Sequence, residues 1–267
     1  MFGQNSRRKM FRQAFFLLAM VASQGVSAAE GEGGLLVAAA ASLSNALPEI
    51  AQQFARDCHC VEAAQMRFSF AASGTLVQQM VQGAPVDLFI SADTESMALA
   101  QKKGVAAESL TFARNMLVLI RPKGRNTVTE LASLKKLPDG ARITLGNPAF
   151  VPAGRYAREV LQADGLWMPL ESRMVLAQNV RQALDYVARG EVEAGFVYAS
   201  DAALLADKVV VAQELRHAPP VLYPAALALP GTGKQALANR FLRYLREAPA
   251  QAVLQKYGFS PLSAQDR

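Results

Sequence analysis

The sequence has few of the side chains that most often bind metals or act as nucleophiles. Its 267 residues include two cysteines and two histidines. Cys58 and Cys60 flank His59, so a metal site there would need further ligands, and the only other histidine is His217. A Cys-x-Cys disulfide closes a strained, very tight ring, although an oxidising compartment would permit it. We therefore expect a surface cysteine pair without a role in ligand binding, and no cofactor.

The sequence also lacks the motifs that mark common hydrolases and nucleotide-binding enzymes. It contains no Gly-x-Ser-x-Gly, no His-Glu-x-x-His and no paired-carboxylate motif. The stretch 231–234, GTGK, resembles part of a phosphate-binding loop. However, Ala228 stands where the first glycine belongs, and Gln235 replaces the Ser or Thr that binds the metal. We therefore predict no catalytic residues and no enzyme activity, with an exported hydrolase as the less favoured alternative.

The basic residues of the chain do not indicate a nucleic-acid-binding protein. The sequence has 28 Lys and Arg against 22 Asp and Glu, a formal net charge of +6. Four basic residues and no acidic ones lie in the first 28 positions; the four are Arg7, Arg8, Lys9 and Arg12. Without them, 24 basic residues face 22 acidic ones, a net charge of +2. No long basic run remains, so we expect no nucleic-acid partner.

The N-terminal 28 residues have the pattern of an export signal. The basic start is followed by an apolar run over 14–22, which is short for a membrane span, and Val26-Ser27-Ala28 has the small-x-small form of a cleavage site. A retained membrane anchor is the alternative, and both general secretory and twin-arginine export stay open. We expect a signal peptide over residues 1–28, cleavage near Ala28, and a mature protein in the periplasm.

The mature chain opens on a strand that leads into a helix start with two hydroxyl groups. The stretch Leu35–Asn45 begins with apolar residues, continues with alanines and contains Ser42 and Ser44; residues such as Leu47 and Phe54 then recur at helical spacing. A serine at a helix start can satisfy free backbone N–H groups. The same N–H groups, together with the helix dipole, can instead hold an anion.

This arrangement of strand, small or hydroxyl residues and helix start recurs along the chain. The next copy is the strand Arg67–Ala71 followed by Ser73. Later helix starts follow predicted strands or turns at Asp93, Pro152, Asn179 and Tyr198. Alternating strands and helices predict an α/β protein with mostly parallel sheets. Because ligands of such sheets bind beyond the carboxyl ends of the strands, these helix starts would face one site.

Two apolar segments are candidates for strands that cross between two lobes. Met116–Ile120 is strongly strand-like and is followed by a change in composition towards Lys, Asn and Thr. Val221–Leu229 is also apolar but contains Pro224, which favours an edge strand or a return crossover over a central strand.

Five segments, in order, resemble the periplasmic molybdate-binding proteins of ABC importers. They read AAAASLSNAL, FAASGTLVQQMVQGAPVDLFISAD, NPAFVPAGRYAREVL, NVRQAL and GFVYASDA, and the resemblance covers nearly the whole mature chain, from about Leu35 to Phe259. The resemblance implies the two-lobed type II periplasmic-binding-protein fold, in which each lobe is a mostly parallel sheet flanked by helices and two crossover strands join the lobes. Lobe 1 would comprise residues 29–116 and 220–262, and lobe 2 residues 117–219.

The resemblance also implies a ligand site between the lobes. The ligand contacts of the family correspond here to Ser42, Ser73, Ala153, Val180 and Tyr198. Three of these residues would supply hydroxyl groups, and backbone N–H groups near Ser73, Ala153 and Val180 would complete the shell. Molybdenum would be present as molybdate alone. This chain lacks the further serines that some relatives carry beside Ser73.

The chemistry of the ligand agrees with this set of residues. A tetrahedral oxyanion without a proton can only accept hydrogen bonds, so it suits a pocket of donors without carboxylates. Helix dipoles and N–H groups can hold its charge without Lys or Arg. We therefore expect a monomeric binding protein that captures molybdate or tungstate and delivers it to an ABC permease in the inner membrane. Another oxyanion, such as sulfate, is the main alternative.

Overall fold

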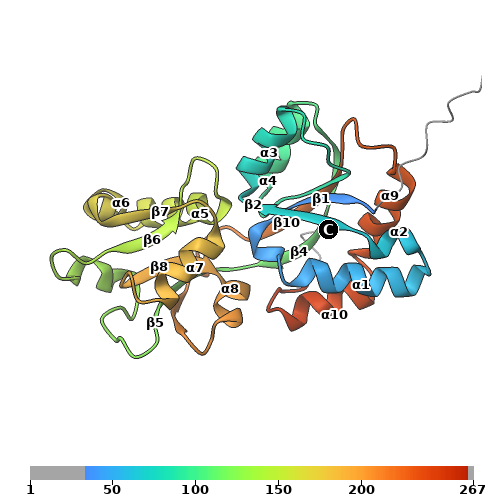
Figure 1. The fold of residues 1–267 in the computed structure, drawn as a ribbon. Coiled ribbons are helices and arrows are strands. Elements are labelled where there is room, and N and C mark those ends of the chain that lie inside the picture. Colours follow the sequence, from blue (N-terminus) through green and yellow to red (C-terminus); the bar gives the residue numbers. More distant parts are fainter. Residues whose placement is uncertain (1–33, 264–267) are drawn as a thin grey trace, which may run out of the picture. The chain divides into compact units, whose positions relative to one another are not determined.

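The structure, a computed structural model, describes residues 34–263 (Figure 1). The expected signal peptide, residues 1–28, lies outside the described residues. Within the described range the chain forms two five-stranded sheets with helices packed on them, so the α/β class and the two lobes are as the sequence predicts. No helix in this range is long and apolar enough to cross a membrane.

The first sheet, the centre of the first lobe, has the strand order β2-β1-β3-β10-β4. Its strands are β1 (Leu36–Ala40), β2 (Arg67–Ala71), β3 (Leu88–Ile90), β4 (Ala106–Asn115) and β10 (Val221–Ala228). The helices of this lobe are the short η1 (Ala41–Leu43), α1 (Ala46–Cys58), α2 (Val61–Ala64), α3 (Ser73–Val81), α4 (Thr94–Lys102), α9 (Gln235–Tyr244) and α10 (Ala248–Lys256). Strands β2, β1 and β3 are parallel, so their carboxyl ends share one edge of the sheet.

Side chains of strand β1 alternate between two hydrophobic cores. Val37 and Ala39 belong to the large core, which also contains Phe54 of α1. Ala38 points to the opposite face and joins a second cluster beneath α3 and α4, with Leu76 as one of its members. Both faces of β1 are therefore buried, which explains why the strand is an unbroken apolar run rather than an alternating one.

The second sheet, the centre of the second lobe, has the strand order β7-β6-β8-β5-β9. Its strands are β5 (Leu117–Pro122), β6 (Ile143–Gly146), β7 (Met174–Ala177), β8 (Ala194–Tyr198) and β9 (Val209–Glu214). The helices are η2 (Leu131–Lys136), α5 (Pro152–Ala163), α6 (Trp167–Leu170), η3 (Glu171–Arg173), α7 (Val180–Ala188) and α8 (Ala199–Leu204). Again the three parallel strands, β7, β6 and β8, lead into helices at one edge.

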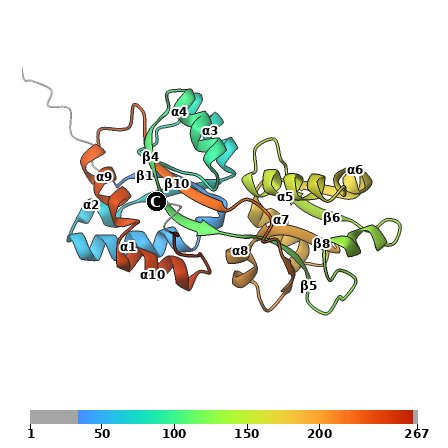
Figure 2. The same ribbon diagram turned by 180° about the vertical axis from the view of Figure 1, so that it is seen from behind.

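The sheets are mostly parallel, as expected, but not wholly so: in each sheet four of the five strands run in one direction and one strand runs against them. In the first sheet β10 is antiparallel to both β3 and β4, and in the second β5 is antiparallel to both β8 and β9. The reason lies in how the chain passes between the sheets. Strands β4 and β5 are separated by Met116 alone, and residues 215–220 connect β9 back to β10 (Figures 1 and 2). These four strands carry the chain out of one sheet and into the other, so they do not belong to strand–helix–strand repeats.

Strand β10 brings the chain back from the second sheet, the return crossover that the sequence allowed, but it occupies an inner position of its sheet, which Pro224 argued against. It pairs with β3 on one side and with β4 on the other. The register against β4 shifts between Tyr223 and Pro224, and a bulge of this kind is a place where a proline without an N–H group fits. The Pro224 carbonyl still accepts a hydrogen bond from the Ser91 N–H group at 2.9 Å.

The cysteine pair lies at the end of α1 and forms a disulfide. Cys58 is the last residue of the helix, and Cys60 stands just before α2. His59 between them has a positive φ of 50°, which turns the chain sharply enough to bring the two side chains together.

Candidate functional site

A small cavity lies where the carboxyl ends of parallel strands from both sheets lead into helices. It is lined by Ala40, Ala41, Ser42, Ala71, Ala72, Ser73, Ala92, Val151, Pro152, Ala153, Asn179, Val180 and Tyr198. Among these described residues none carries a charge, and most are small. Small side chains leave backbone N–H groups within reach of a ligand.

Three helix N-termini contribute to this lining, and each begins directly after a strand or turn. Ser73 is the first residue of α3, Val180 the first of α7 and Ala153 the second of α5. The first N–H groups of an α-helix have no acceptor within the helix. They also carry the positive end of the helix dipole, so three converging helix starts favour an anion between them.

The local sequence explains why these helices begin where they do. Pro152 occupies the first turn of α5, where its missing N–H group costs nothing. Asn179 caps α7 by accepting a hydrogen bond from the Gln182 N–H group at 3.0 Å. Asp93, which follows β3, caps α4 in the same way through the Ser96 N–H group at 3.1 Å. The sequence predicted helix starts at both Asn179 and Asp93.

Two serine hydroxyls of the cavity have hydrogen-bond partners on the side that faces away from the cavity. Ser73 Oγ accepts a hydrogen bond from the Ala92 N–H group at 3.0 Å. Ser42 Oγ lies 3.0 Å from the hydroxyl oxygen of Tyr223, a residue of β10. Both serines are fully buried, with 0% of Ser73 and 1% of Ser42 exposed. Each serine therefore has a second hydrogen-bonding direction left for a group inside the cavity.

Tyr198 contributes a buried hydroxyl group without a partner. Its side chain is 1% exposed, and within the described residues its oxygen has no hydrogen-bond partner. Burial raises the pKa of Tyr198 well above its ordinary value, so the hydroxyl keeps its hydrogen. Leaving a buried O–H group unpaired costs roughly 1–3 kcal/mol. This cost is recovered when a ligand in the cavity accepts the hydrogen bond.

Charged residues surround the cavity without lining it, and two arginines of the second lobe donate hydrogen bonds to the first lobe. Arg155 of α5 donates from Nε to Oδ2 of Asp93 at 3.0 Å and from Nη2 to Ser96 Oγ at 2.7 Å. Arg181 of α7 donates to the Ser42 carbonyl oxygen at 2.8 Å and forms an ion pair with the buried Asp201 at 2.7 Å. The arginines are thus neutralised by protein carboxylates.

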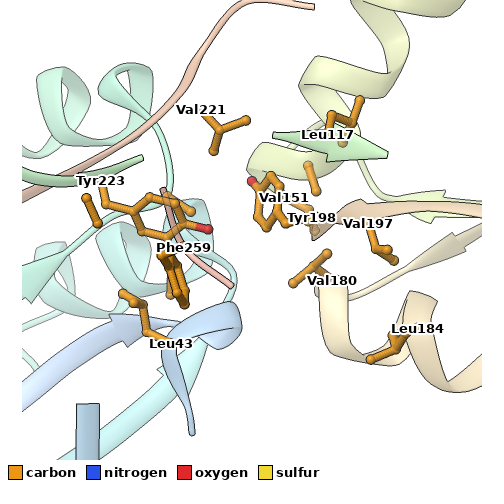
Figure 3. Packing of buried hydrophobic residues seen from close by; sticks show 14 of the residues in the cluster. Leu43, Leu117, Val151, Val180, Leu184, Val197, Tyr198, Val221, Tyr223 and Phe259 are labelled. Atoms are coloured by element: carbon orange, nitrogen blue, oxygen red, sulfur yellow. The ribbon is translucent and has the colours of Figure 1, made fainter. Parts of the chain in front are cut away.

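All five residues expected from the sequence lie in the lining of this one cavity. Ser42 and Ser73 come from the first lobe, and Ala153, Val180 and Tyr198 from the second (Figure 3 labels Val180 and Tyr198). Sequence reasoning missed Asn179 as a lining residue and missed the contact of Tyr223 with Ser42. Neither histidine lines the cavity.

The groups that line the cavity are suited to donating hydrogen bonds. The hydroxyl and N–H groups can donate hydrogen bonds, while no carboxylate and no imidazole reaches the cavity among the described residues that line it. Such a site can hold a small anion that accepts hydrogen bonds on all sides. It offers neither an activated nucleophile nor a general base within the lining.

Comparison with known proteins agrees with the fold. A model of the bacterial extracellular solute-binding protein family matches residues 35–260. The molybdate-binding protein ModA of Escherichia coli strain K12 is 38% identical over 237 residues, covering 86% of this chain and 90% of the relative. A putative ABC transporter substrate-binding lipoprotein, YvgL of Bacillus subtilis, is 34% identical and covers 92% of this chain and 94% of the relative.

The structural comparison leads to the same group of proteins. The solved periplasmic molybdate-binding protein of Azotobacter vinelandii is 25% identical, with a TM-score of 0.74, and the match covers 86% of this chain and all of that one. This likeness confirms the two-lobed type II periplasmic-binding-protein fold expected from the sequence. With the family model spanning both lobes, the chain belongs to the bacterial extracellular solute-binding proteins.

Proposed function

We propose that the protein captures molybdate or tungstate in the cavity between its lobes and delivers the anion to an ABC permease in the inner membrane. The ligand would be held by Ser42, Ser73, Ala153, Val180 and Tyr198, through three hydroxyl groups and the backbone N–H groups at the helix starts. The observation that carries the proposal is the buried, unpartnered hydroxyl of Tyr198 in a cavity lined without charge. A molybdate oxygen would accept its hydrogen.

Further parts of the proposal concern the protein as a whole. Residues 1–28 would direct export and be removed near Ala28, leaving a monomeric protein in the periplasm. Residues 29–116 with 220–262 would move as one lobe, and residues 117–219 as the other. The protein would act without a resident cofactor, without nucleic acid and without catalysing a reaction. The relatives named as molybdate-binding and as ABC transporter components support the ligand and the partner.

Selectivity among oxyanions follows from the donor-only cavity. Near neutral pH molybdate, tungstate and sulfate carry no proton, whereas phosphate carries at least one. The O–H group of phosphate would face donors and leave one of them unpaired, so phosphate should be rejected. Sulfate has shorter bonds, so donors placed for a larger anion cannot all reach its oxygens at hydrogen-bond distance.

Calorimetric titration of the purified mature protein tests the function. We expect tight and similar binding of molybdate and tungstate, much weaker binding of sulfate and no binding of phosphate. Replacement of Tyr198 by Phe should weaken molybdate binding by about ten- to a hundred-fold, since a hydrogen bond to a charged group is worth roughly 1.5–3 kcal/mol. Tight phosphate binding, or hydrolysis of chromogenic esters, would refute the proposal. Preferential sulfate binding would establish the alternative oxyanion.

A further inference from the structure

We propose that Asn115 and Tyr223 form a directional hydrogen-bond relay that makes Ser42 a donor towards the bound anion. Neither residue lines the cavity, so both act as positioning residues through Ser42. The inference rests on the proposed function, because it concerns how the same cavity presents donors. It adds the reason why a serine, which can donate or accept, is held in the donating orientation.

The relay starts at Asn115, whose amide orientation is fixed by the backbone. Its Oδ1 accepts a hydrogen bond from the Met116 N–H group at 2.9 Å. The amide nitrogen is thereby turned to the other side, where it donates to Ser200 Oγ at 2.8 Å and to the Tyr223 hydroxyl oxygen at 3.4 Å. An amide NH₂ group has two hydrogens and no acceptor capacity, so these two contacts have one possible direction.

Tyr223 accepts a hydrogen bond from Asn115 and therefore donates to Ser42. Its hydroxyl oxygen accepts from Asn115, and its single hydrogen is left for Ser42 Oγ at 3.0 Å. The ring of Tyr223 is fully buried and packs edge-on against Phe112, Tyr198 and Phe259, with centroid distances of 6.5, 6.1 and 5.3 Å. Figure 3 labels Tyr223, Tyr198 and Phe259. Rings on several sides hold the hydroxyl in place. Burial raises the pKa of Tyr223 above its ordinary value, which keeps the hydrogen on the oxygen.

Ser42 is the last member of the relay. Because Ser42 Oγ accepts the hydrogen of Tyr223, its own hydrogen is free to point into the cavity that the residue lines. Ser73 has the same arrangement, with the Ala92 N–H group as the fixed donor on its outer side. Both serines thus donate to the ligand. The orientation of the Ser73 hydroxyl is fixed by the Ala92 N–H group, and that of the Ser42 hydroxyl by the relay.

The relay also links the two lobes. Asn115 is the last residue of β4 and is followed by Met116, which leads into β5 of the second sheet. Its amide group contacts Tyr223 in the first lobe and Ser200 of α8 in the second. The donor orientation of Ser42 is therefore set from the place where the chain passes between the sheets.

A double-mutant cycle on molybdate affinity tests whether Tyr223 acts through Ser42. The variants are Tyr223→Phe, Ser42→Ala and the double variant, each titrated calorimetrically and checked by thermal unfolding. We expect Tyr223→Phe to weaken binding about three- to ten-fold when Ser42 is present and less than about two-fold when it is combined with Ser42→Ala. Tyr244→Phe is the matched control, since Tyr244 is also a buried tyrosine whose hydroxyl is hydrogen-bonded, to Asp57, away from the cavity. It should leave the affinity unchanged.

Reversing the relay gives a second and sharper readout. In Asn115→Asp the ionised carboxylate can only accept hydrogen bonds, so the Tyr223 hydroxyl donates to it. The Tyr223 oxygen then accepts a hydrogen bond from the Ser42 hydroxyl. At pH 8 we expect weaker molybdate binding in this variant. Adding Tyr223→Phe to it should leave the affinity unchanged or raise it, which is the opposite of its effect beside Asn115. A purely structural role of Tyr223 predicts no such change of sign.

The outcomes separate the relay from the proposed function. Equal losses from Tyr223→Phe in the wild-type and Ser42→Ala backgrounds, or no loss in either, would overturn the relay while wild-type binding of molybdate upholds the function. A wild-type protein that binds no tetrahedral oxyanion would overturn the function itself. If Asn115→Asp does not fold, the cycle between Tyr223 and Ser42 still decides the question.

Discussion

At the scale of one residue, Ser73 shows how a neighbouring N–H group decides whether a buried hydroxyl donates or accepts a hydrogen bond in the cavity. The Ala92 N–H group follows the third strand of the first sheet and donates to Ser73 Oγ, which leaves the serine hydrogen for the cavity. Ser73 is also the first residue of α3, so its hydroxyl and the helix N–H groups point to the same space. Deleting the hydroxyl should therefore weaken ligand binding more than deleting a serine outside the cavity.

Ser73→Ala is expected to weaken molybdate binding about ten- to a hundred-fold, because it removes a hydrogen bond to a charged group. Ser44→Ala is the matched control, as Ser44 is a half-buried serine of the same strand-to-helix region of the first lobe and does not line the cavity. Calorimetry on both variants, with thermal unfolding to check the fold, measures the effect. Wild-type affinity in Ser73→Ala would remove this residue from the ligand site.

Asp201 gives the protein a predictable dependence of stability on pH. Burial raises the pKa of this carboxyl group to about 6, although the charge of Arg181 opposes the shift. The folded chain therefore holds a proton that the unfolded chain releases as the pH rises from about 4 to about 6. Over that window this group should lower the free energy of unfolding by about 3 kcal/mol, with no further change at higher pH.

Urea unfolding of the wild type and of Asp201→Asn at several pH values between 4 and 7 checks this dependence. The variant cannot titrate at this position, so the wild type should lose stability relative to it as the pH rises. The opposite trend would mean that the ion pair with Arg181 outweighs burial and lowers the pKa.

Residues that line the cavity and residues behind it differ in how well the sequence reveals them. Ser42, Ser73 and Tyr198 stand at strand–helix junctions, and family resemblance adds Ala153 and Val180. Tyr223 has no such signal. Its partner Ser42 lies 181 positions away, and the contact depends on strand β10 lying inside the first sheet. Pro224 argued against an inner strand, and the sequence does not reveal the bulge that lets this proline fit inside the sheet. The contact between Tyr223 and Ser42 was therefore not predicted.

At the scale of elements, the sequence revealed helix starts better than it revealed two of the edge strands. The caps at Asp93 and Asn179 are local hydrogen bonds, so a few residues specify them. Strands β4 and β7 were not predicted, and both lie at sheet edges. β4 mixes polar and apolar residues and β7 has four residues, so neither carries the long apolar run that marked β1 and β5. Pairing partners far away in the sequence create these strands.

The contact of α3 with the loop before α5 gives an element-scale prediction. The Gly74 N–H group donates to the Phe150 carbonyl oxygen of the other lobe at 3.0 Å. A Cβ atom at position 74 would lie 2.8 Å from both the Cα and the carbonyl oxygen of Phe150, where backbone cannot easily yield. Gly74→Ala should thus hinder the approach of the two lobes. We expect molybdate binding to weaken about ten- to a hundred-fold, the range typical of overpacking.

The same substitution should not unfold the first lobe, because alanine stabilises a helix relative to glycine. The melting temperature without ligand should remain at or above the wild-type value, while the affinity falls. Gln79→Ala, at an exposed position of the same helix, is the control and should change neither quantity much. A wild-type affinity for Gly74→Ala would show that this contact is not needed for binding.

At the scale of the whole molecule, polar contacts between the lobes surround the cavity. Arg155 reaches from the second lobe to Asp93 and Ser96, and Arg181 reaches from the second lobe to the backbone of Ser42. A paired arginine does not compete with helix N–H groups for the anion. Its contacts instead add to the free energy that holds the lobes together, so ligand affinity depends on residues that do not touch the ligand.

Arg155→Ala tests this dependence. The substitution removes the hydrogen bonds to Asp93 and Ser96 and leaves the cavity lining intact, so the free protein should shift towards an open arrangement of its lobes. Small-angle scattering should then show a larger radius of gyration for the free variant than for the free wild type, and saturating molybdate should bring the two together. Molybdate affinity should fall, since part of the binding free energy is used to close the lobes. Arg125→Ala is the control, because Arg125 pairs with Glu193 within the second lobe at 2.8 Å. An unchanged radius for Arg155→Ala with and without ligand would mean that these contacts do not govern closure.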